Sequence, residues 1–280
     1  MDISSLLQKS TSVLKDLKFK TPALDTELIL AKALQTTRED ILTNQNKILT
    51  NKQFDLFNTY FIQRLKKKPV AYILGNKEFW KSNFAVNQNV LIPRPDTELI
   101  IQETLRIFDK FKSINILDIG TGSGCIILSL LKELKLSRGV GIDISIDSIK
   151  VAKINAKLQQ MDNRVNFIKS NIDNYNTSNY DLIVSNPPYI KKFKLKSLSE
   201  DVKNFEPKIA LDGGPSGKAL IHKVIKKSSK LLKRKGILIL EFDNDQIYFT
   251  KKTLIENDLF PKKIVKGISG YYRCMVSIKN

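Results

Sequence analysis

The sequence predicts an α/β protein in which an open, mostly parallel sheet follows a small helical bundle. Residues 113–119 have the pattern of a short buried strand that leads into a glycine-rich loop at 120–124 and then into an apolar helix, an order typical of open α/β sheets. From residue 97 onward, apolar runs of strand length alternate with helical stretches. Before residue 80, apolar residues recur at helical spacing without strand alternation.

A chain of 280 residues exceeds the usual size of a single domain, which favours two. Residues 1–80 predict a helical bundle, and apolar–polar alternation over 79–92 with a turn at 87–89 predicts a β-hairpin, so 81–96 is expected to be a linker. Residues 97–280 predict the sheet domain. Its further strands are expected at 139–143, 165–170, 180–185, 236–242 and 271–278, with the last at the antiparallel end of the sheet.

Composition disfavours several classes of protein. The chain has no run of 18 apolar residues and no apolar region at its N-terminus, so we expect no membrane span, no signal peptide and a cytoplasmic location. Cys125, Cys274 and the single histidine, His222, make neither a disulfide framework nor a zinc-binding spacing, so no metal is expected. One histidine also disfavours hydrolases that need a histidine base.

The most informative segment is Asn186-Pro187-Pro188-Tyr189, directly after the apolar run at 180–185. Each proline restricts its own φ and the residue before it, so the segment is expected to leave the strand extended with its carbonyls held as acceptors. A planar NH2 group could donate to the side-chain oxygen of Asn186 and to the carbonyl of Pro187, with Tyr189 packing on its flat face. The alternative is a turn that merely ends the strand, because asparagine and proline are common there.

The glycine-rich loop indicates a second ligand. Glycines at a strand's carboxyl end let the backbone approach a ligand closely. The loop has the spacing G-x-G-x-G, and Cys125 stands where a dinucleotide fingerprint needs glycine, so a nicotinamide cofactor is disfavoured. Asp143 ends the next predicted strand and could accept from both hydroxyls of a ribose. These features together favour a ligand that contains a nucleoside.

Taken together, these motifs resemble the class I S-adenosylmethionine-dependent methyltransferases that act on planar nitrogen. Within that group the chain resembles the HemK/PrmC family, which methylates the side-chain amide of the glutamine in the Gly-Gly-Gln motif of peptide chain release factors. Segments 69–75, 78–80, 91–98, 206–207 and 210–214 carry the resemblance over nearly the whole chain. It implies a Rossmann-like sheet with helices on both faces, S-adenosyl-L-methionine as cofactor and residues 1–80 as the part that docks the substrate protein.

The resemblance also implies roles for individual residues. Catalytic roles fall to Asn186, Pro187 and Tyr189, and the substrate is expected to contact these three and Pro188. The implied cofactor-binding residues are Asp118, Gly120, Thr121, Gly122, Ser123, Gly124, Asp143, Asn171, Ile172 and Asn186.

One position departs from the family pattern. The family usually has an acidic residue followed by an aromatic or apolar one near the adenine, whereas this chain has Asn171 and Ile172. The oxygen of Asn171 can still accept from the adenine amino group, and Ile172 can cover the ring without stacking on it. Cofactor binding is therefore expected to be retained.

Two other functions remain open at this point. An adenine-N6 methyltransferase acting on RNA or DNA would present the same planar NH2 group, and the net charge of +19 favours it. A protein that binds RNA or the ribosome and has lost activity is the third possibility, which the intact motifs disfavour. The lysines at 191–196 could line the entrance for a macromolecular substrate, although solvated surface explains each basic cluster more simply. We expect a monomer with release factors as partners and weak nucleic-acid association.

Overall fold

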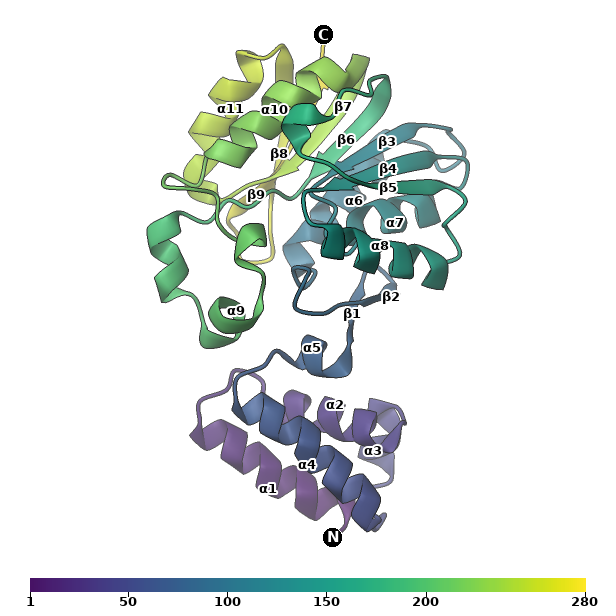
Figure 1. The fold of residues 1–280 in the computed structure, drawn as a ribbon, viewed down its shortest axis with the longest axis vertical. Coiled ribbons are helices and arrows are strands. Elements are labelled where there is room, and N and C mark those ends of the chain that lie inside the picture. Colours follow the sequence, from purple (N-terminus) through teal and green to yellow (C-terminus); the bar gives the residue numbers. More distant parts are fainter. The chain divides into compact units, whose positions relative to one another are not determined.

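The computed structural model describes residues 1–280, and these form two compact units. The first unit comprises Met1–Asn76 together with Ser199–Phe205, and the second comprises Lys77–Leu198 and Glu206–Asn280. Figure 1 labels the elements of both units. Each unit has a hydrophobic core of its own.

The first unit is helical, as predicted. Its helices are α1 (Ile3–Asp16), α2 (Pro22–Leu34), α3 (Arg38–Thr43), α4 (Asn51–Leu65), α5 (Val70–Leu74) and α9 (Glu200–Phe205). Capping boxes at Thr37 and Thr50 start α3 and α4 by satisfying backbone N–H groups that have no partner within the helix. A buried ion pair of 2.7 Å between Arg64 and Asp25 joins α4 to α2.

A β-hairpin precedes the sheet, but not where the sequence predicts it. Strands β1 (Asn76–Phe79) and β2 (Ser82–Ala85) are joined through Trp80 and Lys81, whose φ angles are 43° and 59°. Two consecutive positive φ values produce the tight reversal that suits twisted strands. This turn was missed because neither residue is a usual turn former. The expected turn at 87–89 is a separate one, closed by a hydrogen bond from Val90 N to Asn87 O.

The second unit is built on a sheet of seven strands with the order β5-β4-β3-β6-β7-β9-β8. The strands are β3 (Asn115–Ile119), β4 (Arg138–Asp143), β5 (Val165–Lys169), β6 (Tyr180–Ser185), β7 (Leu232–Glu241), β8 (Leu259–Lys266) and β9 (Tyr272–Lys279). The chain builds outward from β3 to β5 and then returns to place β6 beside β3. Such a reversal marks the crevice where open α/β sheets bind ligands.

The last strand lies at the antiparallel end of the sheet, as predicted, but a strand that the sequence did not predict lies beyond it. β9 is antiparallel to both β7 and β8, and β8 forms the edge. The sequence did not reveal β8, because Pro261 and the lysines after it interrupt its apolar pattern. Proline and lysine suit an edge strand, where a missing N–H costs no ladder hydrogen bond and charge discourages further pairing.

Helices cover both faces of the sheet, which confirms the predicted fold class. One face carries α6 (Glu98–Ile107), α7 (Cys125–Glu133) and α8 (Ile146–Leu158), and the other carries α10 (Ala219–Leu231) and α11 (Ile247–Ile255) (Figure 1). Along β6, Leu182 and Val184 pack into the core on the face that carries α6, α7 and α8. Ile183 packs into the core on the face that carries α10 and α11. The alternating side chains of a strand bury both faces, so the strand is apolar throughout. None of the helices is both long and apolar enough to span a membrane.

Candidate active site

A cavity of about 230 Å³ lies at the carboxyl ends of β3, β4, β5 and β6. This is the crevice that the strand order predicts. The residues that follow each of the four strands contribute to its wall. Among the predicted site residues, those that line it are Gly120, Gly122, Asp143, Asn171, Ile172, Asn186, Pro187 and Pro188.

The glycines of the loop have two different roles. Gly120 and Gly122 have φ angles of 75° and 54°, and a Cβ added to either would meet nothing within 4 Å. They therefore combine a left-handed backbone with open space beside the cavity. Gly124 also has a positive φ, but a Cβ there would lie 3.1 Å from Phe167 and 3.2 Å from Leu128. It allows close packing at the start of α7 and does not line the cavity.

Asp143 joins the end of β4 to the glycine-rich loop. Its Oδ2 accepts from Gly122 N at 3.0 Å and its Oδ1 accepts from Ser145 N at 2.9 Å. Burial raises the pKa of this carboxyl, and the backbone hydrogen bonds oppose that rise. An ionised carboxylate can accept about four hydrogen bonds, so acceptor capacity remains on the side of the cavity.

Asp118 supports the loop from beneath the cavity. It is fully buried, and its Oδ2 accepts from the hydroxyl of Thr121 at 2.7 Å, while Oδ1 has no hydrogen-bond partner in the chain. Burial raises the pKa of Asp118 to about 7. Asp118, Thr121 and Ser123 do not line the cavity, and the hydroxyl of Ser123 is also unpaired. Their direct contact with a cofactor stays a prediction.

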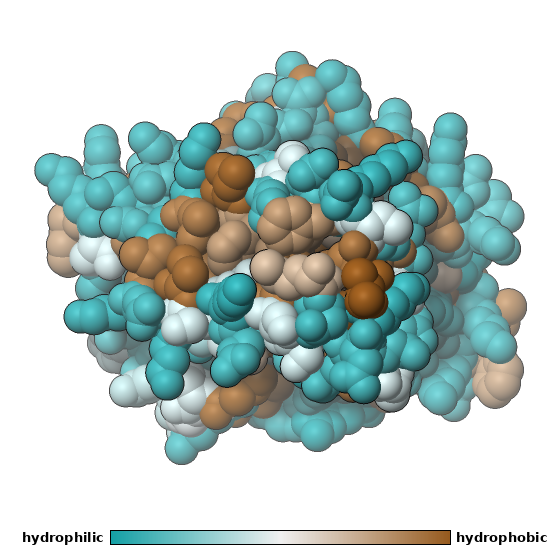
Figure 2. All heavy atoms as spheres, turned by 90° about the horizontal axis from the view of Figure 1, so that it is seen from below, coloured by the Kyte–Doolittle hydropathy of each residue, from teal (hydrophilic) through white to brown (hydrophobic).

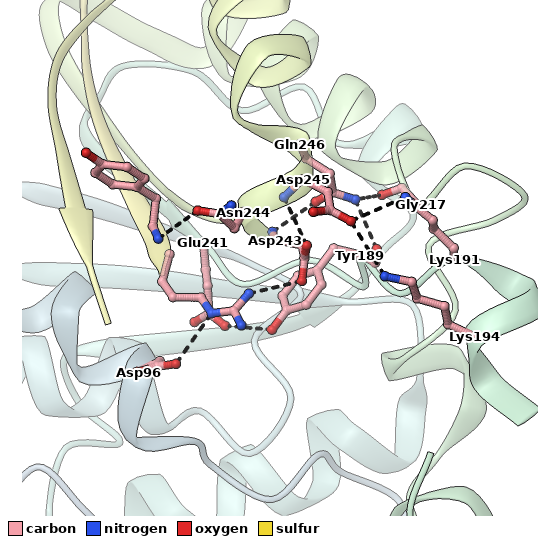
Figure 3. Close-up of polar contacts among 12 residues, drawn as sticks. Asp96, Tyr189, Lys191, Lys194, Gly217, Glu241, Asp243, Asn244, Asp245 and Gln246 are labelled. Carbon is pink, nitrogen blue, oxygen red and sulfur yellow. Dashed lines mark hydrogen bonds and ion pairs between the residues drawn. The ribbon is translucent and has the colours of Figure 1, made fainter. Parts of the chain in front are cut away.

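Two glycines outside the predicted set hold the acceptor loop, residues 186–189, from behind. A Cβ on Gly213 would lie 2.8 Å from the carbonyl oxygen of Pro188, and one on Gly217 would lie 2.3 Å from the carbonyl oxygen of Tyr189. Gln246 donates to that same oxygen of Tyr189 at 3.0 Å and to Gly217 O at 2.8 Å. Gly213, Gly217 and Gln246 do not line the cavity, so the loop is restricted by residues outside it. Figure 3 shows Gln246 and Gly217 beside Tyr189.

A chain of hydrogen bonds runs from Asn186 to a buried carboxylate. Asn186 Nδ2 donates to Thr97 Oγ1 at 3.0 Å, and Thr97 Oγ1 donates to Glu241 Oε2 at 2.7 Å. The hydroxyl of Tyr189 donates to Glu241 Oε1 at 3.2 Å, and its ring packs against the core that lies beside α10 and α11 (Figure 3). Tyr189 does not line the cavity. Its packing on the substrate stays a prediction.

Sequence reasoning missed Thr97 and Glu241 as parts of the site. Thr97 belongs to the segment 91–98, which carries the family resemblance, and Glu241 lies in the predicted strand 236–242 and ends the observed strand β7. A carboxylate at the carboxyl end of a parallel strand, next to the switch point, was the signal that could have found Glu241.

An ion pair joins two loops that contribute to the cavity wall. Arg94 lies 2.5 Å from Glu206, whose carboxylate also accepts from Ile92 N at 3.2 Å. Residues next to this pair line the cavity from both loops, namely Val90, Leu91, Pro207, Ile209 and Ala210. Among the lysines predicted to border the entrance, Lys191 and Lys194 lie 3.5 and 3.6 Å from Asp245 (Figure 3). Exposed pairs of this kind contribute little to stability.

Comparison with known proteins agrees with this geometry. A family model described as the PrmC N-terminal domain matches residues 5–75, and one described as a methyltransferase domain matches residues 110–272. A release factor glutamine methyltransferase of Caulobacter vibrioides is 34% identical, and the match covers 95% of this chain and 93% of that protein. The chain belongs to the release factor glutamine methyltransferase family. A relative with the same name in Fusobacterium nucleatum is 35% identical over 98% of this chain and 78% of its own.

Solved structures support the fold of this family member. A methyltransferase from Pyrococcus furiosus superposes with a TM-score of 0.55 at 16% identity, covering 80% of this chain and 99% of that one. At this identity the likeness bears on the fold, and the chemistry must be argued from the site.

Proposed function

We propose that this enzyme transfers the methyl group of S-adenosylmethionine to the side-chain amide nitrogen of a glutamine in peptide chain release factors, within their Gly-Gly-Gln motif. The observation that carries this proposal is the position of the acceptor loop, which shares one cavity with Gly120, Gly122 and Asp143. A cofactor bound against the glycines and a planar NH2 group held by Asn186 would therefore meet in the same space.

The residues of the cavity fit the cofactor. S-adenosylmethionine supplies an electrophilic methyl group on a positively charged sulfur. Gly120 and Gly122 leave room for its close approach, and Asp143 retains acceptor capacity for ribose hydroxyls. Asn171 Oδ1 accepts from Asp173 N at 3.0 Å, which leaves one lone pair for the adenine amino group, and Ile172 supplies an apolar wall.

Replacing Asp143 tests this assignment. Asp143→Ala should weaken binding of S-adenosylmethionine by roughly 1–3 kcal/mol, because the ribose hydroxyls lose their acceptor and the loop loses its tie at Gly122. Isothermal calorimetry measures the change. Asp147→Ala is the matched control, because Asp147 is an exposed carboxylate at the start of α8 that does not line the cavity. An unchanged affinity in Asp143→Ala would place the ribose elsewhere.

The acceptor loop addresses the main difficulty of the reaction. An amide nitrogen is a poor nucleophile, because its lone pair is delocalised into the carbonyl. Accepting its two N–H groups at Asn186 Oδ1 and Pro187 O would direct the nitrogen at the methyl carbon and stabilise positive charge there. The nitrogen lone pair forms the new N–C bond as the C–S bond breaks with its electrons moving to sulfur, and the proton then leaves to solvent.

Orientation should dominate over any single hydrogen bond in this mechanism. Positioning two reactants can lower a barrier by roughly 7–11 kcal/mol, whereas a hydrogen bond to a charged group is worth about 1.5–3 kcal/mol. The close packing of the loop against Gly213 and Gly217 is the structural counterpart of this requirement.

The experiment uses purified enzyme, labelled S-adenosylmethionine and three substrates in parallel: a release factor, total RNA and DNA. Mass spectrometry of the Gly-Gly-Gln peptide should find one methyl group on the glutamine side chain. Label in nucleic acid without label in the release factor would instead identify an adenine methyltransferase, and no transfer to any substrate would indicate a binding protein without activity.

A further inference from the structure

We propose that Glu241 is a positioning residue that acts through Thr97 to hold the Asn186 amide with its oxygen toward the substrate. The inference rests on the proposed function, because it concerns the acceptor on which methyl transfer depends. Neither residue lines the cavity, and the hydrogen bond of Thr97 to Asn186 is the link through which they reach its wall.

The reaction needs a particular orientation of the Asn186 side chain. The two ends of an asparagine amide have nearly the same shape, but the oxygen accepts hydrogen bonds and the NH2 group donates them. A flipped amide would direct N–H groups at the N–H groups of the substrate and lose the acceptor. In the structure, Nδ2 donates to Thr97 and Oδ1 has no partner within the chain.

Thr97 by itself cannot impose this orientation. A hydroxyl can donate one hydrogen bond and accept two, so it would fit either end of the amide. The orientation is decided by what else the hydroxyl contacts. If its proton is already committed to another acceptor, only a lone pair is left for Asn186, and the NH2 end must turn toward Thr97.

Glu241 supplies that acceptor. An ionised carboxylate cannot donate, so the contact of 2.7 Å commits the Thr97 proton to Glu241 Oε2. The direction then propagates, because Thr97 accepts from Asn186 Nδ2 and Asn186 Oδ1 must point away from Thr97. A carboxylate two hydrogen bonds distant thereby fixes the polarity of the catalytic amide.

The carboxylate is itself held in place. Glu241 ends β7 and is 1% exposed, and its second oxygen accepts from the hydroxyl of Tyr189 (Figure 3). Burial, with a smaller contribution from the charge of Asp96, raises the pKa of Glu241 to about 7, while Thr97, Tyr189 and Arg273 favour the charged form. Burial also raises the pKa of Tyr189, so its hydroxyl stays a donor. Measurements at about pH 8.5 therefore report the ionised state.

The first test separates positioning from binding. At about pH 8.5, with a Gly-Gly-Gln peptide as substrate, Glu241→Gln and Thr97→Val should each lower kcat by about tenfold or more, since either change lets the amide flip. Calorimetry should find the affinity for S-adenosylmethionine unchanged within about twofold. Thr97→Ser, which keeps the hydroxyl, should stay near wild type. Glu103→Gln is the matched control for stability, because Glu103 is a similarly buried carboxylate on α6 that does not line the cavity.

The second test reverses the donor–acceptor direction of the hydrogen bonds that link Asn186, Thr97 and Glu241. Asn186→Asp alone places a carboxylate on each side of the single Thr97 proton, so it should be the least active variant. In the double variant Asn186→Asp with Glu241→Gln, Thr97 can donate to the new aspartate and accept from the new glutamine. The second substitution should therefore raise the kcat of Asn186→Asp, although it lowers the kcat of wild type.

Several outcomes would overturn the inference. These are an unchanged kcat in Glu241→Gln or Thr97→Val, a loss in Thr97→Ser as large as in Thr97→Val, or a double variant no more active than Asn186→Asp. If Glu241→Gln does not fold, the kcat of Thr97→Val compared with that of Thr97→Ser decides whether the inference holds. A wild-type enzyme that methylates no peptide or release factor would refute the proposed function instead, so the two failures are distinguishable.

Discussion

At the scale of single residues, Asn186 is the side chain that we expect to accept a hydrogen bond from the substrate amide. Its Oδ1 has no partner in the chain, and it lies in the wall of the cavity beside Pro187. Asn186→Ala should lower kcat by about 10²-fold, from a loss of roughly 3 kcal/mol, because one acceptor disappears and the substrate amide can rotate. Affinity for the cofactor should change little. A turnover within about threefold of wild type, with the chemical step rate-limiting, would make Asn186 merely a turn residue.

Asp118 gives a prediction about pH at the same scale. Its pKa is raised from 3.8 to about 7, mainly by burial, so between these values the folded state binds a proton that the unfolded state releases. Stability should therefore fall as pH rises through this window. In urea denaturation without cofactor, wild type should lose up to about 4 kcal/mol relative to Asp118→Asn between pH 4 and 7. Parallel pH profiles for the two proteins would show that Asp118 is not perturbed.

At the scale of elements, the carboxyl end of α7 depends on an arginine outside the helix. Arg164 donates to Leu131 O and Lys135 O, both at 2.8 Å, and to Leu134 O at 3.3 Å. These carbonyls lack partners within the helix, and the positive charge suits the negative end of its dipole. Arg164→Ala should lower the free energy of unfolding by roughly 2 kcal/mol.

The control for this change is Arg138→Ala, because the Arg138 side chain is exposed and makes no hydrogen bond. Urea denaturation measures both variants, and calorimetry should find that both bind S-adenosylmethionine like wild type. Equal stability of the two variants would show that water satisfies the carbonyls as well as Arg164 does.

At the scale of the whole molecule, we propose that the N-terminal bundle docks the release factor. The bundle has its own core and exposes several large apolar side chains, among them Val13, Leu17, Ile48 and Ile62. Figure 2, which faces the bundle, shows apolar side chains gathered in one area and surrounded by hydrophilic ones. Such an area on an otherwise charged surface often marks a contact with another protein.

Removing Met1–Gly75 tests this role, since the hairpin and the sheet then remain. Cofactor affinity should be retained, and this also reports that the second unit folds. Methylation of intact release factor should be lost, while a Gly-Gly-Gln peptide at high concentration should still react, because only docking is removed. Full activity of the truncated enzyme on the intact factor would overturn the docking role.

Elements whose signals are local in sequence could be predicted from the sequence. The strand patterns of β3, β4, β5 and β6, the glycine-rich loop and the proline-restricted acceptor loop each lie within a few neighbouring residues. Hydrophobic periodicity and restricted backbone angles act at that range. The sequence therefore predicted the fold class, the glycine-rich loop and the acceptor loop. The hairpin turn at Trp80 was not predictable in this way, because its residues are not typical of turns.

The contacts between distant segments were decided by tertiary structure alone. Strand β8 was not predicted, because Pro261 and its lysines interrupt the apolar pattern, and only its antiparallel pairing with β9 identifies it as the edge strand. Thr97 and Glu241 are 144 residues apart, and they meet because Thr97 stands at the start of α6, which packs against β7, and Glu241 is the last residue of β7. The sequence by itself determined that Asn186 offers an acceptor. The direction in which that acceptor points depends on the proton that Thr97 donates to Glu241, and only folding brings these two residues together.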